Sequence, residues 1–242
     1  MSKSVLFIIN IFDYFHKKKI LKFLKKNLKL TKLEFLVDIG AHHGESINFF
    51  CSNFDVSKII SVEASPKNFK ILGLKIEQIR KKFFNTKISI INLTLGDENK
   101  LVFLKEFNES SSSTIKQIDE NSSYYKKKVK ILNPFKNTEV YQEIEVSMTK
   151  LSDFFLNEKI SKVDFLKIDT EGSEFNILKG LGREISDVKV IYFEHHYDLM
   201  IKKDYKFRDI NNLLLMNNFR KVFKIKMPFR KVFEYIYINQ KK

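Results

Sequence analysis

Cysteine, proline and glycine are scarce in this chain. One of its 242 residues is a cysteine, Cys51, so no disulfide can form within the chain, and a reducing cytoplasmic location is expected. Three prolines and seven glycines interrupt the backbone, so most of the chain is expected to be helix or strand. No cluster of cysteines and histidines has the spacing of a metal site. A small domain held together by disulfides or zinc is therefore excluded.

Long apolar runs are missing as well. The apolar run at residues 5–12 is shorter than the ~20 residues that a membrane-spanning helix needs. Lysines 17–19 follow this run instead of preceding it, and no small-residue cleavage site is visible, which argues against a secretory signal. We expect residues 1–32 to be a helical segment that docks on the domain. A peripheral helix on the inner face of an anionic membrane is the alternative.

Acidic residues are outnumbered. The chain has 44 Lys and Arg against 29 Asp and Glu, a net charge of +15, which suits an anionic partner such as nucleic acid, a phosphorylated substrate or a membrane surface. The lysines are spread over the whole chain, and aromatic residues are not interleaved with them as stacking platforms. Lys, Asn, Ile and Phe are all abundant, which is typical of AT-rich coding. We therefore favour coding bias over nucleic-acid binding.

Apolar strand patterns alternate with amphipathic helix patterns from residue 33 onward. Such alternation predicts an α/β fold with a mostly parallel, doubly wound sheet in one domain, residues 33–242. A Met227-Pro228 turn between two apolar runs predicts a C-terminal antiparallel hairpin. Residues 107–138 are polar and irregular, and we interpret them as a loop insertion that forms a lid or a flexible excursion. The strands are expected at residues 35–39, 58–62, 88–95, 163–168 and 188–193.

Polar residues follow four of the predicted strands. They lie at residues 38–44, 63–65, 169–174 and 194–196. Ligands of an open α/β sheet bind outside the carboxyl ends of its strands, so these four loops are expected to form one site. Glu63 lies 19 residues after Gly44, where the ribose hydroxyls of a nucleotide-type cofactor would be held.

The spacing of the first loop distinguishes between cofactors. Gly40 and Gly44 do not form the G-x-G-x-x-G pattern that admits a pyrophosphate, and Glu45 would add a negative charge near the phosphates. Asp38 before the loop suits a cationic ligand better. This favours S-adenosylmethionine and disfavours a nicotinamide-dependent oxidoreductase.

Three sequence blocks carry a family resemblance. Residues 37–44 (VDIGAHHG), residues 62–69 (VEASPKNF) and above all residues 165–174 (FLKIDTEGSE) resemble motifs of the FkbM-type S-adenosylmethionine-dependent methyltransferases. The resemblance covers about residues 33–200. His42-His43 stands where the family usually has an asparagine-containing pair, and Ala64 where it often has proline. The residues that the resemblance assigns to the cofactor are Asp38, Gly40, His42, Gly44, Glu63, Ala64 and Asp97.

The resemblance implies a class I methyltransferase fold, which is Rossmann-like, and methyl transfer that is usually directed to a hydroxyl oxygen. The acceptor is then a small molecule or glycan: a sugar, glycan, glycolipid or secondary metabolite. An alcohol needs a base, and Asp169, His195 and Glu194 are our candidates, with Glu171 and His196 beside them. A divalent cation is not expected, although Asp169 and Glu171 offer two carboxylates for one. A non-catalytic binding module and a nucleic-acid methyltransferase are the alternative hypotheses.

Overall fold

A seven-stranded sheet forms the centre of the protein in the computed structural model, which describes residues 3–108, 113–132 and 140–242. The strand order is β11-β12-β9-β8-β1-β2-β3. Strands β3, β2, β1, β8 and β9 run parallel, and β12 and β11 add an antiparallel pair at one edge. This confirms the predicted doubly wound α/β sheet with its C-terminal hairpin. The strands are β1 (Lys32–Ile39), β2 (Asp55–Glu63), β3 (Lys87–Asn92), β8 (Val163–Ile168), β9 (Val188–His196), β11 (Phe219–Lys226) and β12 (Val232–Asn239).

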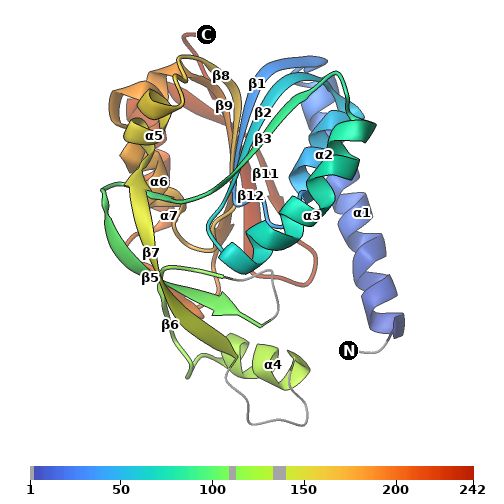
Figure 1. The fold of residues 1–242 in the computed structure, drawn as a ribbon. Coiled ribbons are helices and arrows are strands. Elements are labelled where there is room, and N and C mark those ends of the chain that lie inside the picture. The colour runs from blue at the N-terminus through green and yellow to red at the C-terminus, as the bar shows by residue number, and fades with distance from the viewer. Residues whose placement is uncertain (1–2, 109–112, 133–139) are drawn as a thin grey trace.

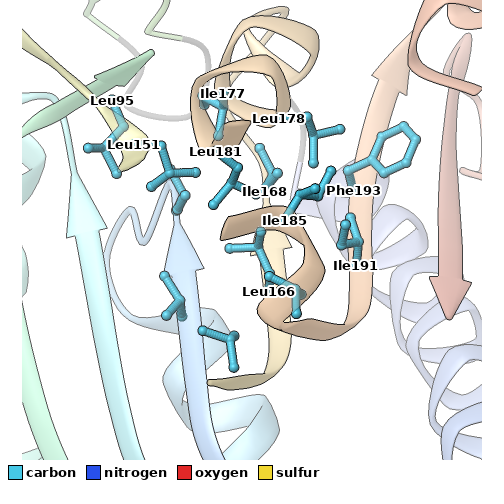
Figure 2. Close-up of a cluster of buried hydrophobic side chains, with 14 of the residues drawn as sticks. Leu95, Leu151, Leu166, Ile168, Ile177, Leu178, Leu181, Ile185, Ile191 and Phe193 are labelled. Atoms are coloured by element: carbon cyan, nitrogen blue, oxygen red, sulfur yellow. The ribbon is translucent and has the colours of Figure 1, made fainter. Parts of the chain in front are cut away.

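Helices cover both faces of this sheet (Figure 1). Parallel strands covered on both faces read as continuous apolar runs, and this explains the buried stretches at the ends of β1 and β8. One face carries α1 (Lys3–Lys26), α2 (Glu45–Asn53) and α3 (Pro66–Lys82), and the other carries α5 (Leu151–Asn157), α6 (Glu174–Leu181) and α7 (Phe207–Met216). Figure 2 shows the apolar cluster on the second face, where Leu166 and Ile168 of β8 pack under Ile177, Leu178 and Leu181 of α6.

Helix α1 docks through its C-terminal half. Ile20 and Leu24 are buried in the apolar cluster against the sheet. His16 forms a buried hydrogen bond with Glu234 of β12, whose carboxylate also accepts from the Tyr192 hydroxyl. Among the described residues, no helix is long and apolar enough to cross a membrane.

A second, three-stranded sheet lies beside the first in the order β4-β7-β5. It consists of β4 (Thr94–Gly96), β5 (Lys100–Phe107) and β7 (Tyr141–Lys150). The single strand that we expect at residues 88–95 is therefore two strands in different sheets. At the break, the Asn92 side-chain amide donates to the Glu63 carbonyl at 2.8 Å, and β4 then pairs with β7 in the second sheet.

The predicted insertion at residues 107–138 contains regular structure. Strand β6 (Gln117–Ile118) pairs with β10 (Ile201–Lys202), and α4 (Ser123–Leu132) follows it. The Ser122 hydroxyl accepts from the Tyr125 N–H at 3.2 Å and so caps α4. The Thr114 hydroxyl donates to the Glu171 carbonyl at 2.7 Å and ties the segment to the loop after β8. Residues 109–112, which include three consecutive serines from Ser110, lie outside the described residues.

Candidate active site

The loop after β1 is pressed against the loop after β8. Gly40 has a φ of 87°, and a Cβ placed on it would lie 1.8 Å from the Asp169 carbonyl oxygen. The Gly40 and Ala41 N–H groups donate to the Val62 carbonyl at 2.8 and 3.0 Å. Only glycine tolerates both the conformation and the contact, so the glycine that the motif requires holds three strand ends together.

Glu63 ends β2 with its carboxylate in a fixed orientation. One oxygen accepts from the His42 N–H at 2.7 Å and the other from the Ser65 N–H at 2.9 Å. Burial raises the pKa of Glu63, although these two backbone donors counteract it. Both of these donors are neutral backbone groups, and the carboxylate lines the cavity, which is what a receptor for two ribose hydroxyls needs.

Lys167 lies between two aspartates at the strand ends. Its ammonium is 3.3 Å from Asp38 and 3.3 Å from Asp169, and it donates to the Gly40 carbonyl at 3.4 Å. Burial alone would lower the pKa of Lys167, but the two aspartates together raise it, so the group stays charged. Asp38 is fully buried beneath the cavity lining, and burial raises its pKa. The cationic partner of the Asp38 carboxylate is Lys167.

A second group of charged side chains lies at the carboxyl ends of β8 and β9. His196 lies 3.3 Å from Glu171 and 3.2 Å from Asp198. Burial acts to lower the pKa of His196, but Glu171 and Asp198 outweigh it and raise the pKa to about 10. Burial raises the pKa of Glu171, and burial with the nearby Asp169 and Glu234 raises that of Glu194 well above its usual range.

His195 points away from this group. Successive residues of a strand face opposite sides, so Glu194 and His196 share the cavity side while His195 faces the other. There its ring contacts Tyr197, Tyr205 and Phe207 at centroid distances of 4.8, 5.9 and 5.6 Å. Burial, with Lys203 and His196 nearby, lowers its pKa to about 3.

One cavity of about 870 Å³ connects these loops, a volume suited to a cofactor with part of a second substrate. The predicted site residues that line it are Gly40, His42, Glu63, Ala64, Asp169, Glu171 and Glu194. Four others do not line it: Asp38, Gly44, Asp97 and His195. Asp97 is paired with Lys179 at 3.0 Å and accepts from Asn176 at 3.3 Å.

The cavity also contains residues to which the sequence analysis assigned no cofactor role. One of them is Lys167. The sequence contained a signal for this residue, because a lysine near the end of a buried, mostly apolar strand needs a charged partner. Leu93, Thr94 and Leu95 are others, and the two leucines offer an apolar wall beside Glu63. These three residues reach the cavity because the chain crosses between the two sheets there, which no local pattern reveals.

The geometry disfavours a cation between Asp169 and Glu171, since each carboxylate already faces a cationic partner, Lys167 and His196. His42, His43 and Glu45 have donor atoms within 4.8 Å of one another. The Glu45 carboxylate there accepts from the His43 N–H at 3.0 Å and lies 3.2 Å from the His42 ring. It stands at the N-terminus of α2, whose dipole favours anions.

The family model of the methyltransferase FkbM domain matches residues 38–221. The chain therefore belongs to the FkbM methyltransferase domain family, and its fold is that of the class I S-adenosylmethionine-dependent methyltransferases. No curated protein sequence matches the chain.

Solved structures agree on the fold. An FkbM methyltransferase from Methylobacillus flagellatus KT is similar with a TM-score of 0.59 and 15% identity, over 89% of this chain and 46% of that one. The chain thus spans about half the length of that relative. Magnesium protoporphyrin IX methyltransferase from Synechocystis PCC 6803 with bound S-adenosylmethionine is similar with a TM-score of 0.53 and 10% identity, over 99% of this chain and 86% of that one.

Proposed function

We propose that this protein transfers the methyl group of S-adenosylmethionine to a hydroxyl oxygen of a sugar, glycan, glycolipid or secondary metabolite in the cytoplasm. The observation that carries the proposal is the division of the cavity into two parts. One part is built from the loops after β1 and β2 around Glu63, and the other contains Asp169, Glu171, Glu194 and His196. The first suits a nucleoside and the second a proton-exchanging acceptor.

The residues present fit this cofactor. Glu63 would accept from the two ribose hydroxyls, and Leu93 and Leu95 would cover the adenine. Gly40 keeps the backbone close enough for the methionine part to lie over the loop. The carboxylate of Asp169 adds a negative charge to the cavity lining, which suits a cationic sulfonium and amino group. A pyrophosphate would instead meet Glu45 at the start of α2.

When bound, S-adenosylmethionine supplies an electrophilic methyl group. The protein has to place an acceptor oxygen in line with that group and remove its proton. We assign the proton acceptor to Asp169, whose carboxylate lines the cavity and is held by Lys167 at 3.3 Å. Burial and the nearby carboxylates raise the pKa of Glu194 well above its usual range, which favours the protonated form that would donate a hydrogen bond to the acceptor. His195 would support β9 from behind as a positioning residue.

Two measurements test the proposal. Calorimetry with S-adenosylmethionine, and with NAD as the control, is expected to show binding of the first ligand alone. Transfer of a radiolabelled methyl group to sugar and glycolipid acceptors is then expected to require Asp169. Absence of S-adenosylmethionine binding would contradict the cofactor, and binding without transfer to any hydroxyl acceptor would favour a non-catalytic module.

A further inference from the structure

The N-terminal half of α1 extends beyond the edge of the sheet at which the cavity opens. Figure 1 shows it reaching past the strands on the same side of the molecule as α4. The buried docking residues Ile20 and Leu24 belong to the other half of the helix. Phe12, Tyr14 and Phe15, in contrast, are 45%, 55% and 55% exposed.

This half of α1 is continuous with the mouth of the cavity. The Phe12 ring contacts the Phe229 ring edge-on at 4.9 Å, and Asp13 lies 3.9 Å from Arg230. Phe229 and Arg230 belong to the turn between β11 and β12, and both line the cavity. Phe229 is also 74% exposed. The apolar surface of the helix therefore leads directly to the cavity opening.

Basic residues surround this surface. Lys17, Lys18 and Lys19 are exposed on α1, and Asp13 is the only acidic residue of that helix. Across the opening, α4 presents Lys126, Lys127 and Lys130, and Lys127 lines the cavity. We call the exposed aromatic residues of α1 and the β11–β12 turn, with the lysines of α1 and α4, the mouth face.

We propose that the mouth face docks on an anionic lipid bilayer and presents the cavity to an acceptor held in that bilayer. The lysines are complementary to anionic headgroups, while exposed aromatic rings take positions at the level of the headgroups. Stable anchoring needs two such signals together, and here both occur next to the mouth of the cavity. The docking itself is independent of the methyl-transfer proposal, whereas the bilayer-held acceptor rests on it.

An apolar sequence decides between a bilayer and RNA as the partner. Residues 5–12 read VLFIINIF, and α1 includes all of them. RNA binding uses charge and aromatic stacking, but it gains nothing from a run of aliphatic residues. An apolar sequence of this kind is typical of a helix that lies in a bilayer interface.

The lack of tryptophan in the chain makes the test sharp. Phe15→Trp places one fluorescent probe on the mouth face, and Phe84→Trp places one on a residue that is 81% exposed, just before the amino end of β3 at the opposite edge of the sheet. With vesicles of phosphatidylcholine and phosphatidylglycerol, we expect a blue shift and quenching by brominated lipid for Phe15→Trp only. Equal responses of the two variants, or none, would overturn the proposal.

Sedimentation with the same vesicles tests the charge. Lys18→Gln/Lys19→Gln is expected to lower binding by about tenfold. Lys87→Gln/Lys162→Gln removes the same charge at the amino ends of β3 and β8 and is expected to change binding little. Equal losses would show an effect of net charge alone and contradict the assigned face. Displacement of the protein by single-stranded RNA with no effect of Phe12→Ser/Phe15→Ser would assign the face to RNA.

These outcomes are separable from failure of the proposed function. Vesicle binding is measured without cofactor, and S-adenosylmethionine binding is measured without vesicles. Unchanged cofactor affinity in all surface variants would show that each remains folded.

Discussion

The imidazole of His196 and the carboxylate of Glu171 lie 3.3 Å apart, although they follow different strands of the sheet. Their pairing places the loops after β8 and β9 against each other at the base of the cavity. It also gives the histidine a pKa of about 10, against 6.5 for an ordinary histidine.

This pair predicts a pH dependence of stability. Because the folded-state pKa of His196 is raised, its contribution is fully present below pH 6.5 and is lost as the pH rises toward about 10. We expect the free energy of unfolding to fall more steeply between pH 7 and 10 in the wild type than in His196→Gln. Urea unfolding at several pH values measures the difference, and parallel pH profiles would contradict the assignment.

Glu63 is predicted to control cofactor affinity. Glu63→Ala removes the carboxylate that two backbone N–H groups hold in the cavity, and we expect S-adenosylmethionine binding to weaken by about 10- to 100-fold. Glu77→Ala, which changes an exposed acid on α3, serves as the control. Calorimetry gives both affinities. Unchanged affinity in Glu63→Ala would remove this residue from the ribose role.

Gly40 is predicted to be intolerant of any side chain. Gly40→Ala would place a methyl group 1.8 Å from the Asp169 carbonyl at a positive φ, so we expect a loss of about 3 kcal/mol or more. Gly73→Ala, within α3, meets no atom within 4 Å and should stabilise the protein by about 0.5–1 kcal/mol. Urea unfolding of the two variants compares them directly. Similar effects in both would disprove the close approach.

Substitutions of Asp169 and His195 are predicted to have different effects, the first on turnover and the second on stability. Asp169→Asn should lower the rate of methyl transfer by about 10²- to 10⁴-fold while largely preserving the fold, as expected for loss of a proton acceptor. His195→Gln, at a site enclosed by aromatic rings, should reduce stability more than turnover. Single-turnover rates and thermal unfolding separate the two effects. Wild-type turnover in Asp169→Asn would exclude it as the base.

The sheet and its edge hairpin could be predicted because each strand carries its own apolar signal. The loops at the carboxyl ends followed from the same patterns, and the structure places Gly40, Glu63, Asp169 and Glu194 of these loops in the cavity lining. The alternation of side chains along a strand could have shown that His195 and His196 face opposite sides of the sheet. Glu194 and His196 are two residues apart on β9 and therefore share one side.

Other features depend on contacts between distant segments. The split between β3 and β4 arises because β4 pairs with β7, which lies some fifty residues later in the chain. The partner of Asp38 is Lys167, which only the pairing of β1 with β8 brings near. Helix α4 has apolar residues at helical spacing, Tyr125, Val129 and Leu132, but its run of lysines and the polar residues before it made it resemble a loop.

The hydrogen bond from Thr114 to the Glu171 carbonyl has a consequence for how this enzyme class can diversify. It is a point of attachment between the segment that contains β6 and α4 and the acidic loop after β8. Exchange of that segment for another of different length would reshape one wall of the cavity, while the loops around Gly40 and Glu63 would be left intact. On the proposed function, acceptor choice and cofactor binding would therefore depend on separate segments of one chain.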